Sequence, residues 1–214
     1  MDSCKKNQRA VCLVDEESEL AETIWTICQQ YGWALHQFEE SSHVPSPSEA
    51  CDPGCIVLDI EAMSGEFSEL VDDFNRRSIL VPVIITAREA TLEQAIQTLR
   101  SGAMTFLEKP CSQEDVEDAL LDAMQTEKEQ RDIRQIVRET KEQLATLTAG
   151  EQEVLELLMK GYANRRIATK LVIGLRTVEA RRARIFEKLE APSLARLIRK
   201  VLTLELSPLE LKKV

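Results

Sequence analysis

Hydrophobic and polar positions follow two patterns along this 214-residue chain. Up to about residue 125, short runs of apolar, often β-branched residues alternate with stretches that repeat apolar positions at helical spacing. A continuous apolar run predicts a strand buried on both faces, and an amphipathic stretch predicts a helix that covers it. The expected strands are residues 10–14, 33–38, 56–59, 83–86 and 104–108, and the expected helices are residues 19–30, 67–74 and 92–99.

This alternation predicts repeated βα units around a parallel sheet. Five strands with about five helices have the size of one doubly wound α/β domain. Residues 41–54 contain three prolines and several serines, so we expect a loop there with at most a short helix.

Residues 113–144 are highly charged and contain neither Gly nor Pro, which predicts one long helix or two helices broken near Thr126. We expect it to begin on the α/β domain and to continue as a linker. Its apolar positions fall roughly on one stripe. Such a stripe indicates a coiled-coil contact between two copies, although a charged stretch is more often a solvated face.

A second helical pattern begins at Thr148, where Thr148 and Glu151 form a capping-box motif. Gly161 ends that helix, and three more helices are expected at residues 164–171, 176–189 and 193–204. The chain is therefore predicted to contain an α/β domain (1–124), a helical linker (125–146) and an all-α four-helix domain (147–214).

Charge is distributed unevenly: residues 1–146 have a net charge of −16, and residues 147–214 have a net charge of +6. An acidic domain repels nucleic acid, whereas a basic one attracts phosphate backbones. Two domains with separate partners explain this gradient more simply than one. Apolar runs such as residues 55–58 and 81–85 are too short to cross a bilayer, so we expect no membrane partner and a cytoplasmic protein. We expect the cysteines to be reduced and to pack as apolar residues, as is usual in the cytosol, rather than Cys51 and Cys55 to form a disulfide or a metal site.

Polar side chains end four of the predicted strands: Asp15 and Glu16 the first, Asp59 the third, Thr86 the fourth and Lys109 the fifth. Functional groups of an open parallel sheet collect at the carboxyl ends of its strands. Converging carboxylates suit Mg²⁺, and a carboxylate beside the metal can act as a nucleophile toward phosphorus. Lys109 and the Thr86 hydroxyl would hold phosphoryl oxygens. Each residue alone is more often a solvated strand end, but all four positions in order predict a site.

With this pattern, residues 9 to about 124 resemble a response-regulator receiver domain. The resemblance implies that Asp59 is the phosphoacceptor, that Thr86 and Lys109 are its catalytic partners and that Phe106 is the switch aromatic. It also implies that Mg²⁺ is held by Asp15, Glu16, Asp59 and the backbone carbonyl of Glu61, and that the Lys109–Pro110 bond is cis.

Three features depart from the receiver pattern. The acidic pair is Asp-Glu rather than Asp-Asp, so Glu16 must fold an extra methylene to reach a metal. The loop after Asp59 is about two residues short and lacks the usual Met-Pro, and the stretch from Thr86 to Phe106 is one residue longer than common. These features keep open the alternative of a pseudo-receiver that is controlled by protein contacts without phosphorylation.

Residues 160–188 carry nine Lys and Arg residues and only two acidic ones, Glu179 and Glu187. Such a density is an electrostatic footprint for DNA, although charge alone fits a solvated basic face equally well. In the expected helix 176–189, Val178 and Ile185 turn inward, while small residues and arginine lie on the opposite side. A helix of this kind suits the major groove.

Residues 147–204 closely resemble the LuxR-type helix-turn-helix of the FixJ/NarL subfamily, with residues 176–189 as the recognition helix. In this resemblance Glu179, Ala180 and Ala183 face base edges, and Thr177, Arg181 and Arg184 meet phosphates or nearby bases. Arg181 replaces a common His. The expected DNA-binding residues are Arg176, Thr177, Glu179, Ala180, Arg181, Ala183, Arg184 and Lys188. Residues 193–204 match the family's dimerisation helix, or pack into the core.

Together these features predict a transcriptional response regulator rather than an enzyme. A partner sensor histidine kinase would phosphorylate Asp59 in the presence of Mg²⁺, promoting homodimerisation and binding to double-stranded DNA. Besides the pseudo-receiver, the rival reading is a hydrolase that uses Asp59 as its nucleophile; it lacks a second general acid at a suitable spacing.

Overall fold

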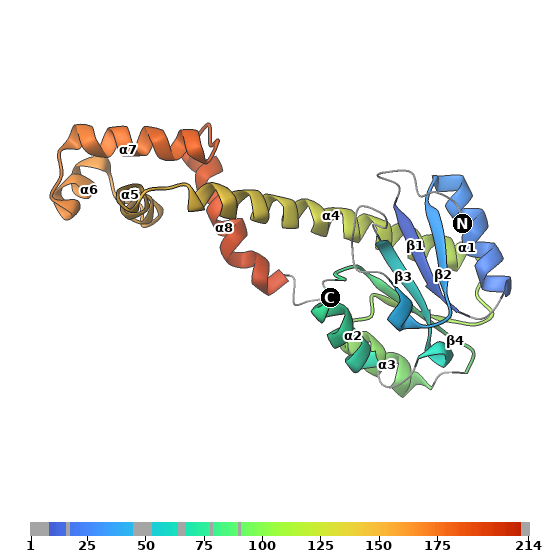
Figure 1. Ribbon diagram of the computed structural model, residues 1–214. Coiled ribbons are helices and arrows are strands. Elements are labelled where there is room, and N and C mark those ends of the chain that lie inside the picture. Colours follow the sequence, from blue (N-terminus) through green and yellow to red (C-terminus); the bar gives the residue numbers. More distant parts are fainter. Residues whose placement is uncertain are drawn as a thin grey trace. The chain divides into compact units, whose positions relative to one another are not determined.

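A computed structural model describes residues 9–15, 18–44, 53–63, 67–77, 79–89 and 91–210 of the chain. The chain divides into two compact units, the first within residues 1–130 and the second at Arg131–Lys212 (Figure 1). The first unit is built around a sheet, and the described part of the second contains helices and no strand. The α/β fold class expected for the first part and the all-α class expected for the last part are both confirmed.

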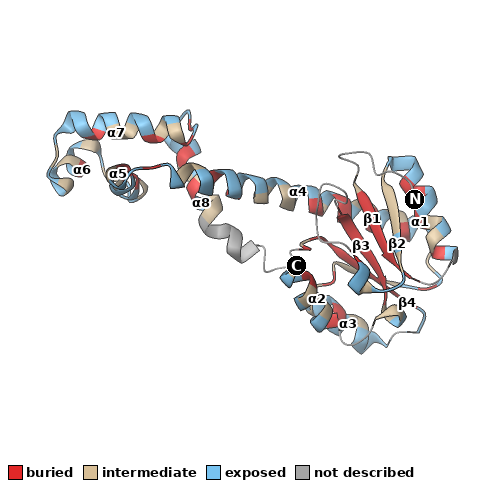
Figure 2. Cartoon of the chain, in the orientation of Figure 1, coloured by how far each residue is buried: buried red, intermediate tan, exposed pale blue. Residues whose placement is uncertain are grey.

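The first unit contains one five-stranded parallel sheet with the strand order β2-β1-β3-β4-β5. This order places β3 at the centre, between β1 and β4, and all three strands are buried along their length. Figure 2 shows the buried β1 and β3 in red. It is one of the two common doubly wound orders, in which sites form where strands end. The strands are β1 (Ala10–Val14), β2 (Ala34–Phe38), β3 (Pro53–Asp59), β4 (Val83–Ala87) and β5 (Thr105–Glu108).

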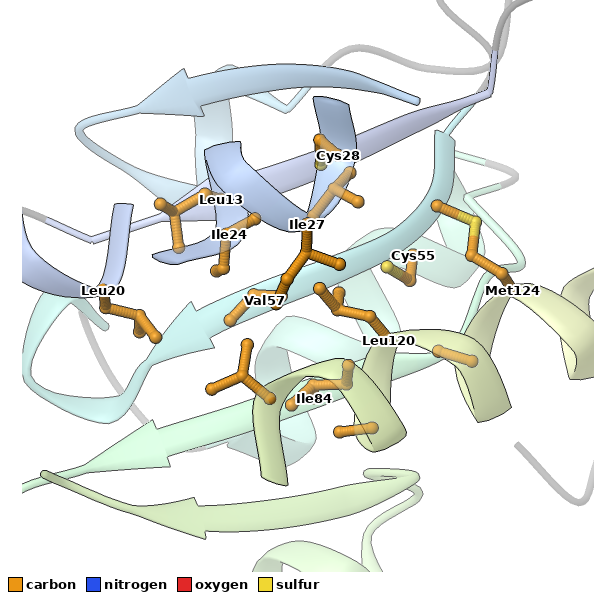
Figure 3. Packing of buried hydrophobic residues seen from close by; sticks show 14 residues of the cluster. Leu13, Leu20, Ile24, Ile27, Cys28, Cys55, Val57, Ile84, Leu120 and Met124 are labelled. Carbon is orange, nitrogen blue, oxygen red and sulfur yellow. The ribbon is translucent and has the colours of Figure 1, made fainter. Parts of the chain in front are cut away.

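Helices cover both faces of this sheet, because the apolar side chains of the central strands point alternately to either side. On one face, Phe67 and Phe74 of α2 join a core formed by β1, β3 and β4. On the other face, α1 and the start of α4 (Gln113–Ala145) pack on the remaining side chains of these strands (Figure 3). The helices are α1 (Ser18–Tyr31), α2 (Phe67–Arg76) and α3 (Leu92–Arg100), with short 3-10 turns η1 (Ser41–His43) and η2 (Ile60–Ala62).

The segment 41–54, expected to be a loop, is partly strand, so this prediction was wrong at its end. The strand β3 begins at Pro53, which pairs with Ala10 of β1, and the register shifts between Ala10 and Val11. Proline is tolerated as the first residue of a strand because the ladder needs no N–H donor from it there. Residues 45–52, including Cys51, lie outside the described part of the chain.

The charged segment forms one helix, α4 (Gln113–Ala145), so the alternative of a break near Thr126 was wrong. Close to that point the helix is held by Arg9, whose Nη1 donates to the Met124 carbonyl at 3.0 Å and lies 3.6 Å from the buried carboxylate of Glu127. The apolar positions of α4 pack into two different cores: Leu120 lies in the core of the first unit, and Leu144 packs against the core of the second. The coiled-coil contact stays a prediction.

The second unit contains four helices after the end of α4, as expected from the sequence. The predicted capping box is confirmed: the Thr148 hydroxyl accepts from the Glu151 N–H, and the Glu151 carboxylate accepts from the Thr148 N–H. Val154, Ile167, Ile185 and Leu197 form the core between the helices. The helices are α5 (Ala149–Met159), α6 (Asn164–Leu171), α7 (Leu175–Lys188) and α8 (Leu194–Glu210).

The contribution of core packing to the stability of the first unit can be tested by comparing a buried and a partly exposed isoleucine. Ile27 of α1 is fully buried, whereas Ile96 of α3 is 41% exposed. We expect Ile27→Val to lower the free energy of unfolding by about 1 kcal/mol and Ile96→Val to change it by less than about 0.5 kcal/mol. Denaturant titration followed by tryptophan fluorescence measures this, since both tryptophans, Trp25 and Trp33, lie in this unit. Equal losses in the two variants would contradict the prediction.

Candidate functional site

The residues expected at the strand ends come together at one edge of the sheet. Asp15 follows β1, Asp59 ends β3, and Lys109 follows β5; all three are buried. The Lys109 Nζ donates to Asp15 Oδ2 at 2.8 Å and to Asp59 Oδ2 at 2.6 Å. One ammonium group therefore joins two carboxylates that are 44 residues apart in the sequence.

The buried ammonium stays charged in this setting. Burial alone would lower the pKa of Lys109, but hydrogen bonds and opposite charges from Asp15 and Asp59 outweigh it and raise the pKa above its ordinary value. A charged group with its counter-charges in place is suited to stabilise further negative charge.

The Thr86 hydroxyl, on β4 beside Asp59 in register, has an unusual environment. It is fully buried, and its Oγ1 has no hydrogen-bond partner among the described residues. A buried hydroxyl without a partner costs about 1–3 kcal/mol, so its presence calls for an explanation. The geometry offers one, since a group bound to Asp59 would bring new acceptors to this edge.

The other predicted residues of this site are placed as follows. Phe106 on β5 is half-buried against the core formed with α2, and Glu61 is exposed in η2, where its N–H donates to Asp59 Oδ1 at 3.0 Å. The Lys109–Pro110 bond is cis, as expected. Glu16 lies outside the described residues. A cleft of about 430 Å³ opens beside the site and is lined by Glu19, Leu20, Thr23, Arg88, Glu89, Lys109, Pro110 and Cys111.

Along α7, the residues expected to bind DNA fall into two groups. Six of the eight are exposed along the helix: Arg176, Thr177, Glu179, Ala180, Ala183 and Arg184. The remaining two, Arg181 and Lys188, bind groups of the same domain. Arg181 Nη1 donates to the Gly150 carbonyl, and Lys188 Nζ donates to Glu151 Oε2 at 2.7 Å and to the Thr146 carbonyl at 2.9 Å.

Glu151 was expected only as a capping residue, and sequence reasoning missed its pairing with Lys188. Its carboxylate is 2% exposed. The pKa of Glu151 is lowered from 4.5 to about 2. The hydrogen bond from Lys188 is the largest cause, and the hydrogen bond from the Thr148 N–H is the second. The signal that could have revealed the pair is the capping motif itself, which places an acid at the start of α5 within reach of a neighbouring cation.

This lowered pKa predicts an acid-sensitive domain. Because Glu151 is more acidic in the folded than in the unfolded chain, its contribution is complete above about pH 4.5 and is lost as the pH falls toward about 2. We expect the protection of α5 and α7 amides against hydrogen exchange, taken relative to the intrinsic exchange rate at each pH, to fall over this range. Glu151→Gln should flatten that part of the pH profile, and an unchanged profile would contradict the assignment.

The fold and these two sites define a two-domain transcription regulator, with a phosphoacceptor-type receiver and a helix-turn-helix. Two family profiles agree: the response regulator receiver domain matches residues 11–121, and the bacterial regulatory proteins of the luxR family match residues 145–201. The chain belongs to the two-component response regulators with a LuxR-type DNA-binding domain. None of the described helices is long and apolar enough to span a membrane.

Similar proteins cover nearly the whole chain. The C4-dicarboxylate transport transcriptional regulatory protein DctR of Rhodobacter capsulatus is 31% identical over 88% of this chain and 97% of its own. The transcriptional regulatory protein FixJ of Azorhizobium caulinodans is 29% identical over 92% of this chain and 94% of its own. The structure of the response regulator StyR matches with a TM-score of 0.74 and 26% identity, over 91% of this chain and 98% of that one.

Proposed function

We propose that a partner histidine kinase phosphorylates Asp59 and that phosphorylation promotes homodimerisation and binding of α7 to double-stranded DNA. The observation that supports this most directly is the buried pairing of Asp15 and Asp59 through Lys109, beside the partnerless Thr86 hydroxyl. The cleft next to Lys109 leaves room for a phosphodonor.

In the proposed reaction a carboxylate oxygen of Asp59 attacks the phosphorus of the kinase's phosphohistidine. The new O–P bond replaces the N–P bond, and the imidazole leaves with the electron pair. Lys109 and the Thr86 hydroxyl donate to the phosphoryl oxygens, which gives the orphaned hydroxyl a partner. Asp59 ends β3 and caps η2, so the backbone holds its carboxylate in place.

The donor set suits Mg²⁺, which is bound in proteins by one or two carboxylates with water completing its shell. Asp15 and Asp59 provide two buried carboxylates, and Glu16 with the Glu61 carbonyl would complete the set. Among the described residues, no three His, Cys, Asp or Glu side chains cluster as a metal site. When bound, Mg²⁺ neutralises charge on the transferred phosphoryl group.

We infer that the signal leaves the site through Thr86 and Phe106. These residues stand on the adjacent strands β4 and β5, where Ile85 pairs with Phe106. A Thr86 hydroxyl drawn toward a phosphoryl group frees space beside β5, and the half-buried ring can turn into it. Such a step shifts a two-state equilibrium toward the DNA-competent form.

This function is tested by measuring DNA binding together with the molecular mass of the protein in solution, which reports its oligomeric state. The full-length chain is incubated with Mg²⁺ and acetyl phosphate, and its binding to a duplex selected from a random pool is titrated alongside light scattering. Phosphorylation should raise affinity and convert monomer to dimer. Binding and mass that are the same with and without acetyl phosphate would refute the proposal.

The exposed arginine Arg184 predicts the electrostatic part of DNA binding. If Arg184 neutralises one phosphate, Arg184→Ala should weaken binding to selected and random duplexes alike and lower the slope of log K against log salt by roughly one. Glu190→Gln, an exposed change just after α7, is the control and should leave the slope unaltered. A loss confined to one base position would instead assign Arg184 to a guanine.

A further inference from the structure

Arg181 lies in the middle of α7, between residues proposed to face DNA, but its side chain is directed to α5. Only 28% of it is exposed. Its Nη1 donates to the Gly150 carbonyl at 3.2 Å and lies 3.8 Å from Glu153 Oε2. The guanidinium is therefore engaged by the first turn of α5 and not by solvent alone.

Gly150 provides the space for this contact. A Cβ built on Gly150 would lie 2.5 Å from Arg181 Cζ and 2.7 Å from both terminal nitrogens, far inside van der Waals contact. The backbone itself does not demand glycine, because Gly150 is helical and is not among the glycines with positive φ. Alanine is the better helix former at such a position, so the guanidinium explains the glycine.

A second cation fastens the same two helices. Lys188 follows Arg181 by seven residues, which is about two turns and returns to the same side of α7. It binds Glu151 and the Thr146 carbonyl, in and just before the first turn of α5. Thus α7 is attached to the start of α5 at two points along its length.

We propose that Arg181 is a positioning residue: it anchors α7 to α5 through the space left by Gly150 and so fixes which side of α7 meets DNA. The inference rests on the proposed DNA-binding function of α7. Because its guanidinium is occupied by α5, Arg181 adds no phosphate contact. It acts through the orientation of Glu179, Ala180 and Ala183, which are exposed next to it.

The test uses Gly150→Ala, Arg181→Met and the double variant of the full-length chain. The methyl group of Gly150→Ala meets only the flexible end of Arg181, so it displaces the guanidinium without moving the backbone. Each single variant should weaken binding to the selected duplex roughly tenfold, as expected for a lost charge-assisted hydrogen bond. The double variant should be no weaker than Arg181→Met, and the salt slope on random duplex should be unchanged.

Other outcomes overturn the proposal. If Arg181→Met lowers the salt slope by roughly one while Gly150→Ala binds as the wild type or better, Arg181 contacts DNA directly. If all three variants bind the selected duplex as the wild type does, the anchor does not orient α7. Hydrogen exchange in α5 and α7 verifies folding, and Arg181→Met, which keeps the apolar stem, decides alone if Gly150→Ala unfolds. Arg184→Ala separates the two proposals, since wild-type binding and salt slope in that variant would contradict the proposed phosphate contact of α7, whichever result Arg181→Met gives.

Discussion

An Asp59→Asn chain should take up no phosphoryl group from acetyl phosphate and Mg²⁺, whereas the wild-type chain gains one. The amide has the same shape as the carboxylate but lacks its nucleophilic, charged oxygen. An asparagine oxygen can still accept the hydrogen bond from Lys109, so the edge of the sheet should keep its structure. Intact mass spectrometry measures the effect, and labelling should fall from one group per chain to below detection.

The control for this experiment is Asp122→Asn, which changes an exposed acid on α4 by the same single atom. We expect it to be labelled as the wild type is. Labelling that survives in Asp59→Asn would show that another residue accepts the phosphoryl group.

The same measurement decides between the two rival readings. A wild-type chain that gains no mass would favour the pseudo-receiver, with the Asp-Glu pair and the short loop after Asp59 as the cause. A chain that is labelled only briefly and releases phosphate through many turnovers would favour the hydrolase. Stable single labelling supports neither.

The three inner strands β1, β3 and β4 could be predicted from the sequence because they are buried on both faces. Runs such as residues 10–14 and 83–85 are continuously apolar, rich in β-branched residues and too short for a buried helix, so a buried parallel strand is the pattern that fits them. The start of β3 could not be predicted. Pro53 and Gly54 are typical of a turn, and they belong to a strand only because this segment pairs with β1.

The phosphoacceptor edge was predictable in its residues for a related reason. Parallel strands carry their carboxyl ends to one edge, so Asp15, Asp59, Thr86 and Lys109 had to approach one another once the strands were assigned. The distances were not predictable. The Lys109 ammonium contacts both carboxylates only because its side chain extends far enough from the end of β5. The residues around Lys109 in the sequence do not determine that extension.

The direction of side chains on α7 was the least predictable feature. Helical spacing distinguishes the buried face of Val178 and Ile185 from the opposite face, but residues at the border can turn either way. Arg181 and Lys188 stand at this border. Groups of α5 decide their direction, and those groups lie about 30 to 40 residues earlier in the sequence.

Replacing Lys188 by methionine should destabilise the helical unit by about 2–4 kcal/mol. The variant leaves the Glu151 carboxylate, 2% exposed, without its cation, and removing one partner of a buried pair costs more than the pair contributes. The cost stays below the upper end of such cases because Lys188 is 31% exposed and because Glu151 keeps the Thr148 N–H at the positive end of α5. Methionine retains the apolar stem, so the loss reports the charge.

Hydrogen exchange of α5 and α7 amides in the full-length chain measures this loss, because the tryptophans report only on the first unit. Arg184→Met is the matched control: it removes one cation from an exposed site on the same helix and should change protection by less than about 0.5 kcal/mol. The double variant Glu151→Gln/Lys188→Met should recover part of the stability, since it removes the lone buried charge. Equal effects of Lys188→Met and Arg184→Met would mean that the pair with Glu151 contributes nothing, and Lys188 would then be available to DNA as the sequence first suggested.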